Sequence, residues 1–450
     1  MQILKVTLKQ HTPLIHFQYS EEGATLRASE VKPKLDKYII EKVGGGPYET
    51  VKKSVKETHS GWFMDKKGIY SLSYKMSIEP IGSILSSDIE GYFGYRSSKN
   101  GSKPIPAPMF FGNMQSKDEP KGLFQQKGFS NSSDLSLVII CKNSELLDQI
   151  VRYIYNFFID TNFGTRQSKG YGSFSIDNRE WEHFLASRGI YERPVISYPY
   201  FTTSGDLKTL FTEMEWFYKA IRSGINDCYG KDLFYMKSLM FAYAKEKGEQ
   251  WEKKTIKSIF YDYLSEEDNF SEKVYKGEVQ KHPRNNDNLT FTSANEGDYL
   301  FKDCLGLSTV EQWKKPYFDE TGKLKYGDSF ILSKESDSEE NPIQRMKSPI
   351  LLKPIRMANG NYRVYVIHSS IPDRFLGAGF YVGISDCEDE FLLNTFPKFS
   401  IEDYFDFLFR KNHGTGTYRV DIESLMSTGR DTAKAKRIKN IFAELRNTYN

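Results

Sequence analysis

The sequence predicts an α+β protein, and three observations lead to this prediction. Apolar and polar residues alternate in the segments 2–10 and 69–78, as they do in strands that are buried on one face. An apolar run at 135–141 indicates a buried strand. Two further segments, 27–42 and 144–160, carry apolar residues at the spacing of helices.

These elements follow one another as strand, helix, strand and then again as strand, helix, strand. Pro33 is tolerated only near the first turn of a helix, so we expect an irregular start to the first helix. Asn143 is expected to cap the second helix, and 171–176 is the last strand. This order is that of ferredoxin-like domains, an architecture that RNA-recognition modules share. We therefore expect one antiparallel sheet with both helices on one face.

The composition along the chain predicts its domain organisation. Residues 1–178 form the ferredoxin-like domain, with a long insertion of little regular structure at about 80–133, where Gly, Pro, Ser and Lys are frequent. Residues 179–300 are expected to be a mostly helical and irregular insertion, with 265–300 forming polar loops. Residues 301–450 are expected to form a second, degenerate ferredoxin-like unit with C-terminal helices.

Further elements are expected within these regions. A hairpin is predicted through Asn359-Gly360, because this dipeptide favours tight turns between strands. The expected elements are helices at 206–222, 232–247, 400–411 and 431–447, and strands at 348–355, 361–368 and 391–393.

The overall composition excludes some classes of protein. The 62 Lys and Arg nearly balance 59 Asp and Glu, so any basic site must come from local clustering. The cysteines lie far apart, which excludes a zinc ribbon and favours a reduced, cytoplasmic protein. The N-terminus lacks an apolar signal core and no apolar run approaches membrane-spanning length, so no membrane association is expected. The cysteines are Cys141, Cys228, Cys304 and Cys387.

A glycine-rich segment, FGTRQSKGYGSF (residues 163–174, the glycine loop), is the main candidate for a binding site. Its glycines would let backbone N–H groups surround an anion, its two cations would add charge, and its tyrosine could stack on a base. The alternative is a flexible turn with solvated cations. The candidate residues are Gly164, Arg166, Lys169, Gly170, Tyr171 and Gly172.

Three segments together resemble the RAMP superfamily of CRISPR-associated proteins. They are the glycine loop before the last strand, GATLRASEVKPKL (23–35) and QRMKSPILLKPI (344–355). Within this superfamily, the chain is similar to the large, two-unit subunit at the head of the Cmr-type (type III-B) effector complex. The resemblance covers roughly 1–177 and parts of 300–370.

The resemblance implies a non-catalytic subunit that holds guide or target RNA by phosphate contacts in antiviral defence. Its partners would be CRISPR RNA, target RNA and other effector subunits, and no cofactor is implied. Each implied cation could instead be solvated, and Arg345 could pair with the acidic run at 335–341. The implied cations are Arg27, Lys32 and Lys34 on one side of an RNA groove, Arg166 and Lys169 on the other, and Arg345, Lys347 and Lys353 extending it.

Two other functions stay open. Some RAMP proteins are metal-independent endoribonucleases with an N-terminal histidine, so His11 and His16 are candidates for a general acid or base. Their spacing places them on opposite faces of an extended segment, so at most one faces the sheet cleft. The third possibility is a scaffold whose aromatic surface binds protein, since aromatic residues make up 15% of the chain.

Metal-dependent chemistry has less support in the sequence. The histidines form no H-x-x-H or H-E-x-x-H pattern. Target-cleaving relatives use an aspartate in a loop after the first helix. The Gly44–Pro47 region has none, and Asp65 in the following loop stays open as a candidate. An acidic cluster near residue 388 is expected to be solvated; its members are Asp386, Glu388, Asp389 and Glu390.

Overall fold

The computed structural model divides the chain into two compact units. The first unit consists of Met1–Met214 and Leu351–Ile367, and the second of Glu215–Ile350 and His368–Asn450. The described residues are 1–15, 25–64, 70–82, 85–87, 95–98, 101–104, 129–131, 134–188, 196–227, 234–253, 255–256, 299–318, 324–385, 387, 389–412, 414–426 and 432–449.

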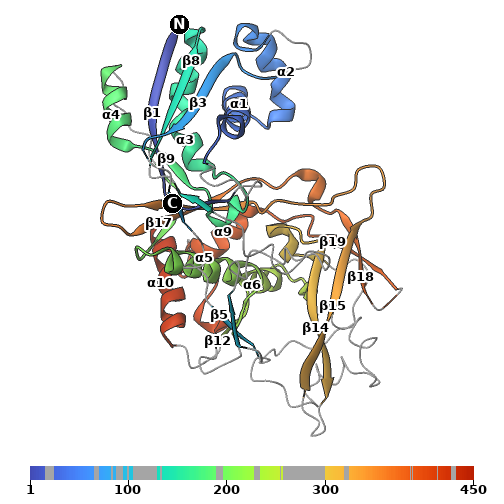
Figure 1. Ribbon diagram of the computed structural model, residues 1–450. Helices are drawn as coiled ribbons and strands as arrows, with labels where there is room; N and C mark the ends of the chain where they lie inside the picture. The colour runs from blue at the N-terminus through green and yellow to red at the C-terminus, as the bar shows by residue number, and fades with distance from the viewer. Residues whose placement is uncertain are drawn as a thin grey trace. The chain divides into compact units, whose positions relative to one another are not determined.

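The first unit is built on a four-stranded antiparallel sheet in the order β3-β8-β1-β9 (Figure 1). The register places Leu4 opposite Ile139 and Val6 opposite Leu137, so the buried apolar residues share one face. The prediction that four segments form one antiparallel sheet is confirmed. The strands are β1 (Gln2–Gln10), β3 (Tyr74–Pro80), β8 (Asp134–Cys141) and β9 (Phe174–Ile176).

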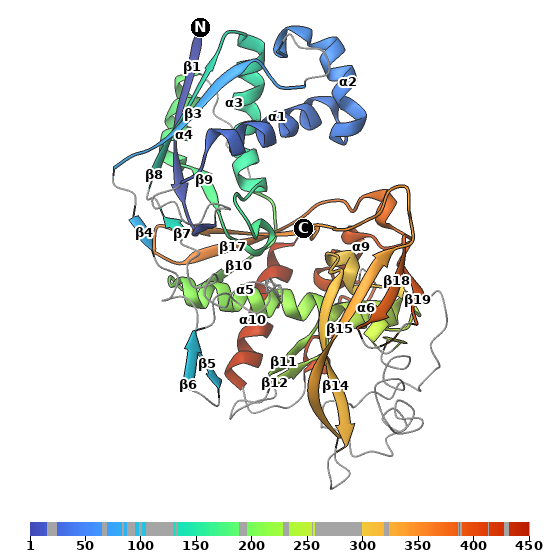
Figure 2. The ribbon, with the colours of Figure 1, turned by 45° about the vertical axis from the view of Figure 1, so that its right-hand side comes forward.

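Two helices pack against this sheet and against each other (Figure 2). Asn143 caps the second helix as predicted, because its side chain accepts from the Leu146 N–H. The irregular start expected for the first helix is wrong, and Pro33 lies inside a regular helix. The carbonyl group that Pro33 leaves unpaired is that of Ser29, an exposed residue open to water. The helices are α1 (Ala28–Gly44) and α3 (Ser144–Asp160).

The insertion at about 80–133 contains short strands where the structure describes it, and 105–128 lies outside the described residues. Two helices of this unit were not expected from the sequence. Asp177 starts the second of them, since its carboxylate accepts from the N–H groups of Arg179 and Glu180. These elements are α2 (Tyr48–Thr58), α4 (Asn178–Ser187), β2 (Leu14–Ile15), β4 (Leu85–Ser87), β5 (Tyr95–Ser98), β6 (Gly101–Pro104) and β7 (Phe129–Asn131).

The predicted hairpin is confirmed: β16 (Ile350–Arg356) and β17 (Tyr362–His368) are hydrogen-bonded neighbours. Gly360 has a φ of 86°, a conformation that the tight turn requires and that glycine adopts without strain. We expected this hairpin in the second domain. It joins the first unit instead, because β17 pairs antiparallel with β10 (Tyr200–Thr203).

The second unit contains a five-stranded sheet in the order β13-β19-β18-β15-β14 (Figure 2). Strands β14, β15, β18 and β19 are joined as successive antiparallel neighbours, an order that differs from that of the first sheet. The strand predicted at 391–393 is confirmed as part of β19. The strands are β13 (Tyr299–Leu300), β14 (Val310–Phe318), β15 (Leu324–Ser336), β18 (Gly379–Ile384) and β19 (Phe391–Thr395).

Three of the four additional helices are confirmed, namely those expected at 206–222, 400–411 and 431–447. The helix expected at 232–247 is wrong in its first part, because Phe234–Met236 is strand β12, paired with β11 (Ile225–Asp227). The loops expected up to residue 298 lie outside the described residues. The helices are α5 (Leu207–Arg222), α6 (Leu239–Glu246), α9 (Ile401–Phe409) and α10 (Thr432–Thr448). Within the described residues, no helix combines the length and apolar character that would let it cross a bilayer.

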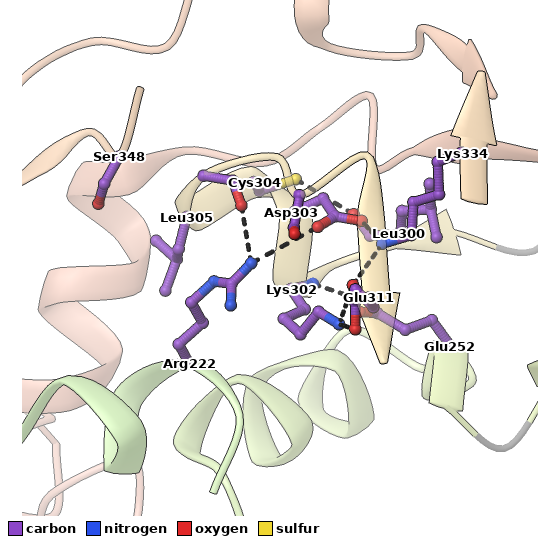
Figure 3. Close-up of polar contacts among 12 residues, drawn as sticks. Arg222, Glu252, Leu300, Lys302, Asp303, Cys304, Leu305, Glu311, Lys334 and Ser348 are labelled. Carbon is purple, nitrogen blue, oxygen red and sulfur yellow. Dashed lines mark hydrogen bonds and ion pairs between the residues drawn. The ribbon is translucent and has the colours of Figure 1, made fainter. Parts of the chain in front are cut away.

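A network of buried charges stabilises the second unit, and the sequence did not indicate it (Figure 3). Lys334 on β15 places its Nζ 2.5 Å from Asp303 Oδ2 and 2.8 Å from Glu311 Oε1. Lys302 Nζ lies 2.6 Å from both carboxylate oxygens of Glu311. Arg222 donates to the Gly306 carbonyl at 2.8 Å. Cations and carboxylates therefore alternate in a site from which water is largely excluded.

The ionisation of this network follows from its pairing. Burial opposes the charged form of Glu311, but Lys302 and Lys334 hold its pKa well below the ordinary value. Burial likewise opposes charge on Lys334, yet Asp303 and Glu311 raise its pKa. Glu252, whose Oε2 accepts from the Lys302 backbone N–H, has a raised pKa chiefly because of burial.

We predict that Lys334→Met lowers the free energy of unfolding by about 3–5 kcal/mol, because it leaves two buried carboxylates without their shared cation. Urea unfolding followed by tryptophan fluorescence measures the loss. The matched control is Lys439→Met, which removes an exposed lysine 2.8 Å from Glu423 and should cost at most about 1 kcal/mol. Equal, small losses for both variants would show that the network adds nothing to stability.

Candidate nucleic-acid interface

The glycine loop joins α3 to β9 and takes an unusual backbone conformation. Gly164, Gly170 and Gly172 have φ values of 74°, 83° and 64°, and Arg166 shares this left-handed region with φ 57°. Arg166 is the one non-glycine residue with positive φ among the described residues. A single turn of 3₁₀ helix, Gln167–Lys169, lies between these positions. The loop thus has a specific backbone conformation that depends on its glycines.

The expectation that its glycine N–H groups form an anion site is wrong. The Gly164 N–H donates to Glu30 Oε1 at 2.7 Å. The Gly170 N–H donates to the Gln167 carbonyl and the Gly172 N–H to the Pro13 carbonyl, at 3.2 and 2.9 Å. Because the loop backbone is largely buried, its polar groups must be satisfied within the protein, and none of these three is left for a phosphate.

The expectation that Tyr171 stacks on a base is also wrong. Its ring is 1% exposed and stacks on Phe211, with ring centroids 4.3 Å apart. The positive φ favours glycine on both sides of Tyr171, and at Gly172 packing against backbone also requires it. A Cβ on Gly170 would lie 2.9 Å from Met214 Cε, and one on Gly172 would lie 2.0 Å from the Phe163 carbonyl oxygen. The glycines permit close approach of the chain to itself and not to a ligand.

The start of α1 lies beside the loop, as the resemblance implied. Lys34 donates to the Asn162 carbonyl at 3.5 Å and to Glu30 Oε1 at 3.3 Å. Arg27, Glu30 and Lys34 are spaced so that they share one face of α1. Arg27 is exposed, and Arg166 and Lys169 are half-buried. Sequence reasoning missed Glu30, which is the acidic member of an i, i+4 pair with Lys34.

Two of the implied RNA contacts serve the fold instead. The Lys32 ammonium donates to Asp36, Ser71 and the Leu72 carbonyl, and lies over the Tyr74 ring. Lys353 is fully buried and lies out of reach of a phosphate at the surface. Its pKa is well below the ordinary value because of burial.

The other implied cations, Arg345 and Lys347, are exposed and belong to the second unit. Within the described part of the chain, Arg345 makes no ion pair, so pairing with the acidic run at 335–341 is not observed. Asp389 and Glu390 are exposed, whereas Asp65, Asp386 and Glu388 lie outside the described residues.

His11 is held by two hydrogen bonds at the edge of the first sheet. Its Nδ1 accepts from the Arg356 backbone N–H at 3.1 Å, and its Nε2 lies 2.7 Å from Ser175 Oγ. Burial chiefly, together with nearby cations including Lys353, lowers the pKa of His11 to about 3. A neutral ring whose accepting nitrogen is already occupied is poorly suited to acid–base catalysis near neutral pH. His16 lies outside the described residues.

We predict that acid destabilises the protein partly through His11. Between pH 6.5 and about 3, the unfolded chain binds a proton at this ring and the folded chain does not. Its contribution to stability is thus fully present above pH 6.5 and decreases as the pH falls. The variant His11→Asn keeps an acceptor for Arg356 and cannot bind the proton. Its melting temperature should fall less than that of the wild type between pH 7 and 4, and parallel profiles would contradict the assignment.

We further predict that Gly172→Ala lowers the free energy of unfolding by about 3 kcal/mol or prevents folding, because its Cβ would collide with the chain at Phe163. The control is Gly45→Ala: Gly45 has a φ of 67°, and no atom lies within 4 Å of the added Cβ. Backbone strain alone should cost about 1–2 kcal/mol there. Thermal and urea unfolding compare the two variants. A similar small loss in both would mean that the loop can rearrange.

Family models match most of the chain. Residues 1–225 match the model of the Cmr1 N-terminal domain, and residues 235–426 match that of the Cmr1 C-terminal domain. These matches confirm the resemblance to the Cmr-type subunit that the sequence indicated. No curated protein matches the chain.

Two solved structures show similarity. The crystal structure of Cmr1 from Pyrococcus furiosus in its apo form is 10% identical, with a TM-score of 0.30, over 49% of this chain and 72% of that chain. A chain in the cryo-EM structure of the type III-B Cmr-beta bound to cognate target RNA is 13% identical, with a TM-score of 0.23, over 39% of this chain and 58% of that chain. Since two domain models in the expected order account for the sequence from residue 1 to residue 426, the chain belongs to the Cmr1 family.

Proposed function

We propose that this protein is a non-catalytic RNA-binding subunit of a type III-B CRISPR effector complex. It would hold guide or target RNA through phosphate contacts and assemble with the other effector subunits. Membership of the Cmr1 family supports this role. The order β3-β8-β1-β9, with helices between β1 and β3 and between β8 and β9, supports assigning the first unit to the ferredoxin-like RAMP fold.

The observation that carries the proposal is the group of cations where α1 meets the glycine loop. Lys34 and Arg166 both have lowered pKa values, chiefly because of burial. Burial costs these cations part of their hydration, and a phosphate that contacted them would offset part of that cost. Arg27 and Lys169 add charge at the two ends of the group. Such contacts depend little on RNA sequence, as a subunit that holds many different guides requires.

The site differs from the one that the sequence predicts. Phosphates would meet side chains and not the loop backbone, whose glycine N–H groups are occupied. Glu30 sits within the group as the carboxylate partner of Lys34 and Gly164. It would weaken RNA binding by repulsion while it keeps the loop in place.

The endoribonuclease alternative finds less support. His11 is neutral and engaged on both nitrogens in the described structure. The scaffold alternative predicts no RNA affinity, so the experiment below also distinguishes it.

We predict that replacing Arg166 and Lys169 together with Ala weakens RNA binding by roughly one to two orders of magnitude. The slope of log affinity against log salt should also decrease by about one to two units, because fewer counterions are released. Filter binding of single-stranded RNA at several salt concentrations measures both quantities. Glu30→Gln should instead raise the affinity for RNA, since it removes a negative charge. It keeps an acceptor for the Gly164 N–H.

The matched control replaces Lys53 and Lys142, two exposed cations of the same unit, with Ala. It removes the same charge away from the loop and should change affinity about threefold or less. The recovered RNA should be intact both in EDTA and in magnesium. A folded Arg166/Lys169 variant with unchanged affinity and salt slope would refute the proposed interface, and cleavage in EDTA would refute the non-catalytic role.

A further inference from the structure

A cavity of about 260 Å³ lies within the first unit, apart from the cations of the proposed RNA interface. It is formed where α3, α4 and β17 meet, and aromatic, aliphatic and polar side chains line it, with polar groups providing more of its surface than apolar groups. A volume of this size accommodates one flat heterocycle and no large ligand. The residues that matter are Tyr155, Trp181, Glu182, Leu185, Arg363 and Tyr365.

Two hydrogen-bond donors at this cavity find no acceptor among the described residues. They are the indole N–H of Trp181 and the Nε–H of Arg363. Trp181 is 2% exposed, so water cannot readily satisfy its donor. Buried donors without partners are rare in folded proteins, because each one forfeits a hydrogen bond to water. A ligand that carries acceptors would supply what the protein lacks here.

The walls of the cavity are held rigidly. Trp181 is stacked between Tyr155 and Phe184, with interplanar angles of 19° and 20°. The Tyr155 hydroxyl donates to Asn178 Oδ1 at 2.9 Å. The Arg363 guanidinium lies 4.3 Å above the Tyr200 ring centroid, and its Nη1 donates to the Tyr365 hydroxyl at 3.3 Å. The donors are therefore fixed in direction before any ligand enters.

We propose that this cavity binds a single unstacked nucleobase, with guanine preferred, and this inference rests on the proposed RNA-binding function. Arg363 would donate to the O6 and N7 acceptors that guanine presents on one edge. Glu182 supplies a carboxylate, which accepts from the N–H groups on the other edge of guanine. Because Tyr155 and Phe184 cover the faces of the Trp181 ring, a base would meet the edge of this ring and the polar groups of the cavity.

Other ligands fit the same groups less well. Adenine carries an amino donor where guanine has O6, so it would face Arg363 with a donor. Pyrimidines have one ring and would fill less of the cavity. A small acidic molecule would satisfy Arg363 but would meet the charge of Glu182. The pairing of an arginine with a glutamate is what selects guanine.

The first test is titration of the whole protein with GMP, followed by calorimetry and tryptophan fluorescence. We expect GMP to bind saturably and with higher affinity than AMP, CMP or UMP. Arg363→Gln and Trp181→Phe should each weaken GMP binding about tenfold, and the second removes a donor while it keeps an aromatic ring. The matched control is Arg356→Gln, which removes an exposed arginine on β16, outside the cavity, and should bind GMP as the wild type does. Thermal melts verify that each variant is folded.

The second test uses two single-stranded RNAs that differ by one guanine in a uridine background. The RNA with guanine should bind several-fold tighter, and Arg363→Gln should abolish this difference while Arg356→Gln keeps it. GMP binding without any guanine effect in RNA would overturn the RNA base as the occupant and leave a free nucleotide. Absence of saturable GMP binding, with RNA affinity still sensitive to Arg166 and Lys169, would overturn the cavity inference alone. If the wild-type protein does not bind RNA at all, the proposed function itself is refuted.

Discussion

Strand β16 is tied to both ends of the glycine loop by side chains that bond to backbone, and the first unit depends on this connection. All of these bonds join residues about 180 or more positions apart, and all are 2.9 Å or shorter. They fix the positions at which the loop begins and ends, and these contacts hold the unusual backbone conformation between them. The bonds run from Lys353 to the carbonyls of Thr161 and Phe174, from Asn162 to that of Leu352, and from Ser173 to that of Pro354.

The partners of its glycine N–H groups explain why the loop differs from a phosphate-binding nest. A nest requires backbone N–H groups that point into an open concavity. Here, Glu30, the Gln167 carbonyl and the Pro13 carbonyl already accept from the glycine N–H groups of the loop. The cations that remain outward are side chains at the rim, Arg166 and Lys169, and the proposed RNA contact moves there with them.

The sequence predicted those features that depend on local pattern. The alternation in 2–10, the apolar run at 135–141 and the cap at Asn143 determine elements whose causes lie within a few positions, and these elements are confirmed. Contacts between distant residues could not be predicted in this way. Lys353 sits in a segment that reads QRMKSPILLKPI, where a lysine is ordinarily exposed, and its burial depends on carbonyls near residues 161 and 174. Tyr171 was misassigned for the same reason, because Phe211, which covers its ring, is 40 positions away.

Two buried lysines show that the groups around a buried ammonium determine the direction of its pKa shift. Lys353 in the first unit meets carbonyl oxygens, whose partial charges cannot compensate for removing a full charge from water, and its pKa falls. Lys334 in the second unit meets two carboxylates, which do compensate, and its pKa rises.

The opposite pKa shifts of Lys353 and Lys334 imply that their surroundings respond differently to acid. Lowered pKa values are found for Lys353 and His11 in the first unit and for His368 in the second. Each of these bases loses stabilising free energy as the pH falls, since the unfolded state takes up the proton first. In the second unit, the ion pairs persist until Glu311 is protonated, which its strongly lowered pKa delays to more acidic conditions. Raised pKa values act in the other direction, so Glu252 makes the second unit relatively more stable on mild acidification. Mild acid should therefore weaken the surroundings of the glycine loop before it weakens the buried charge network.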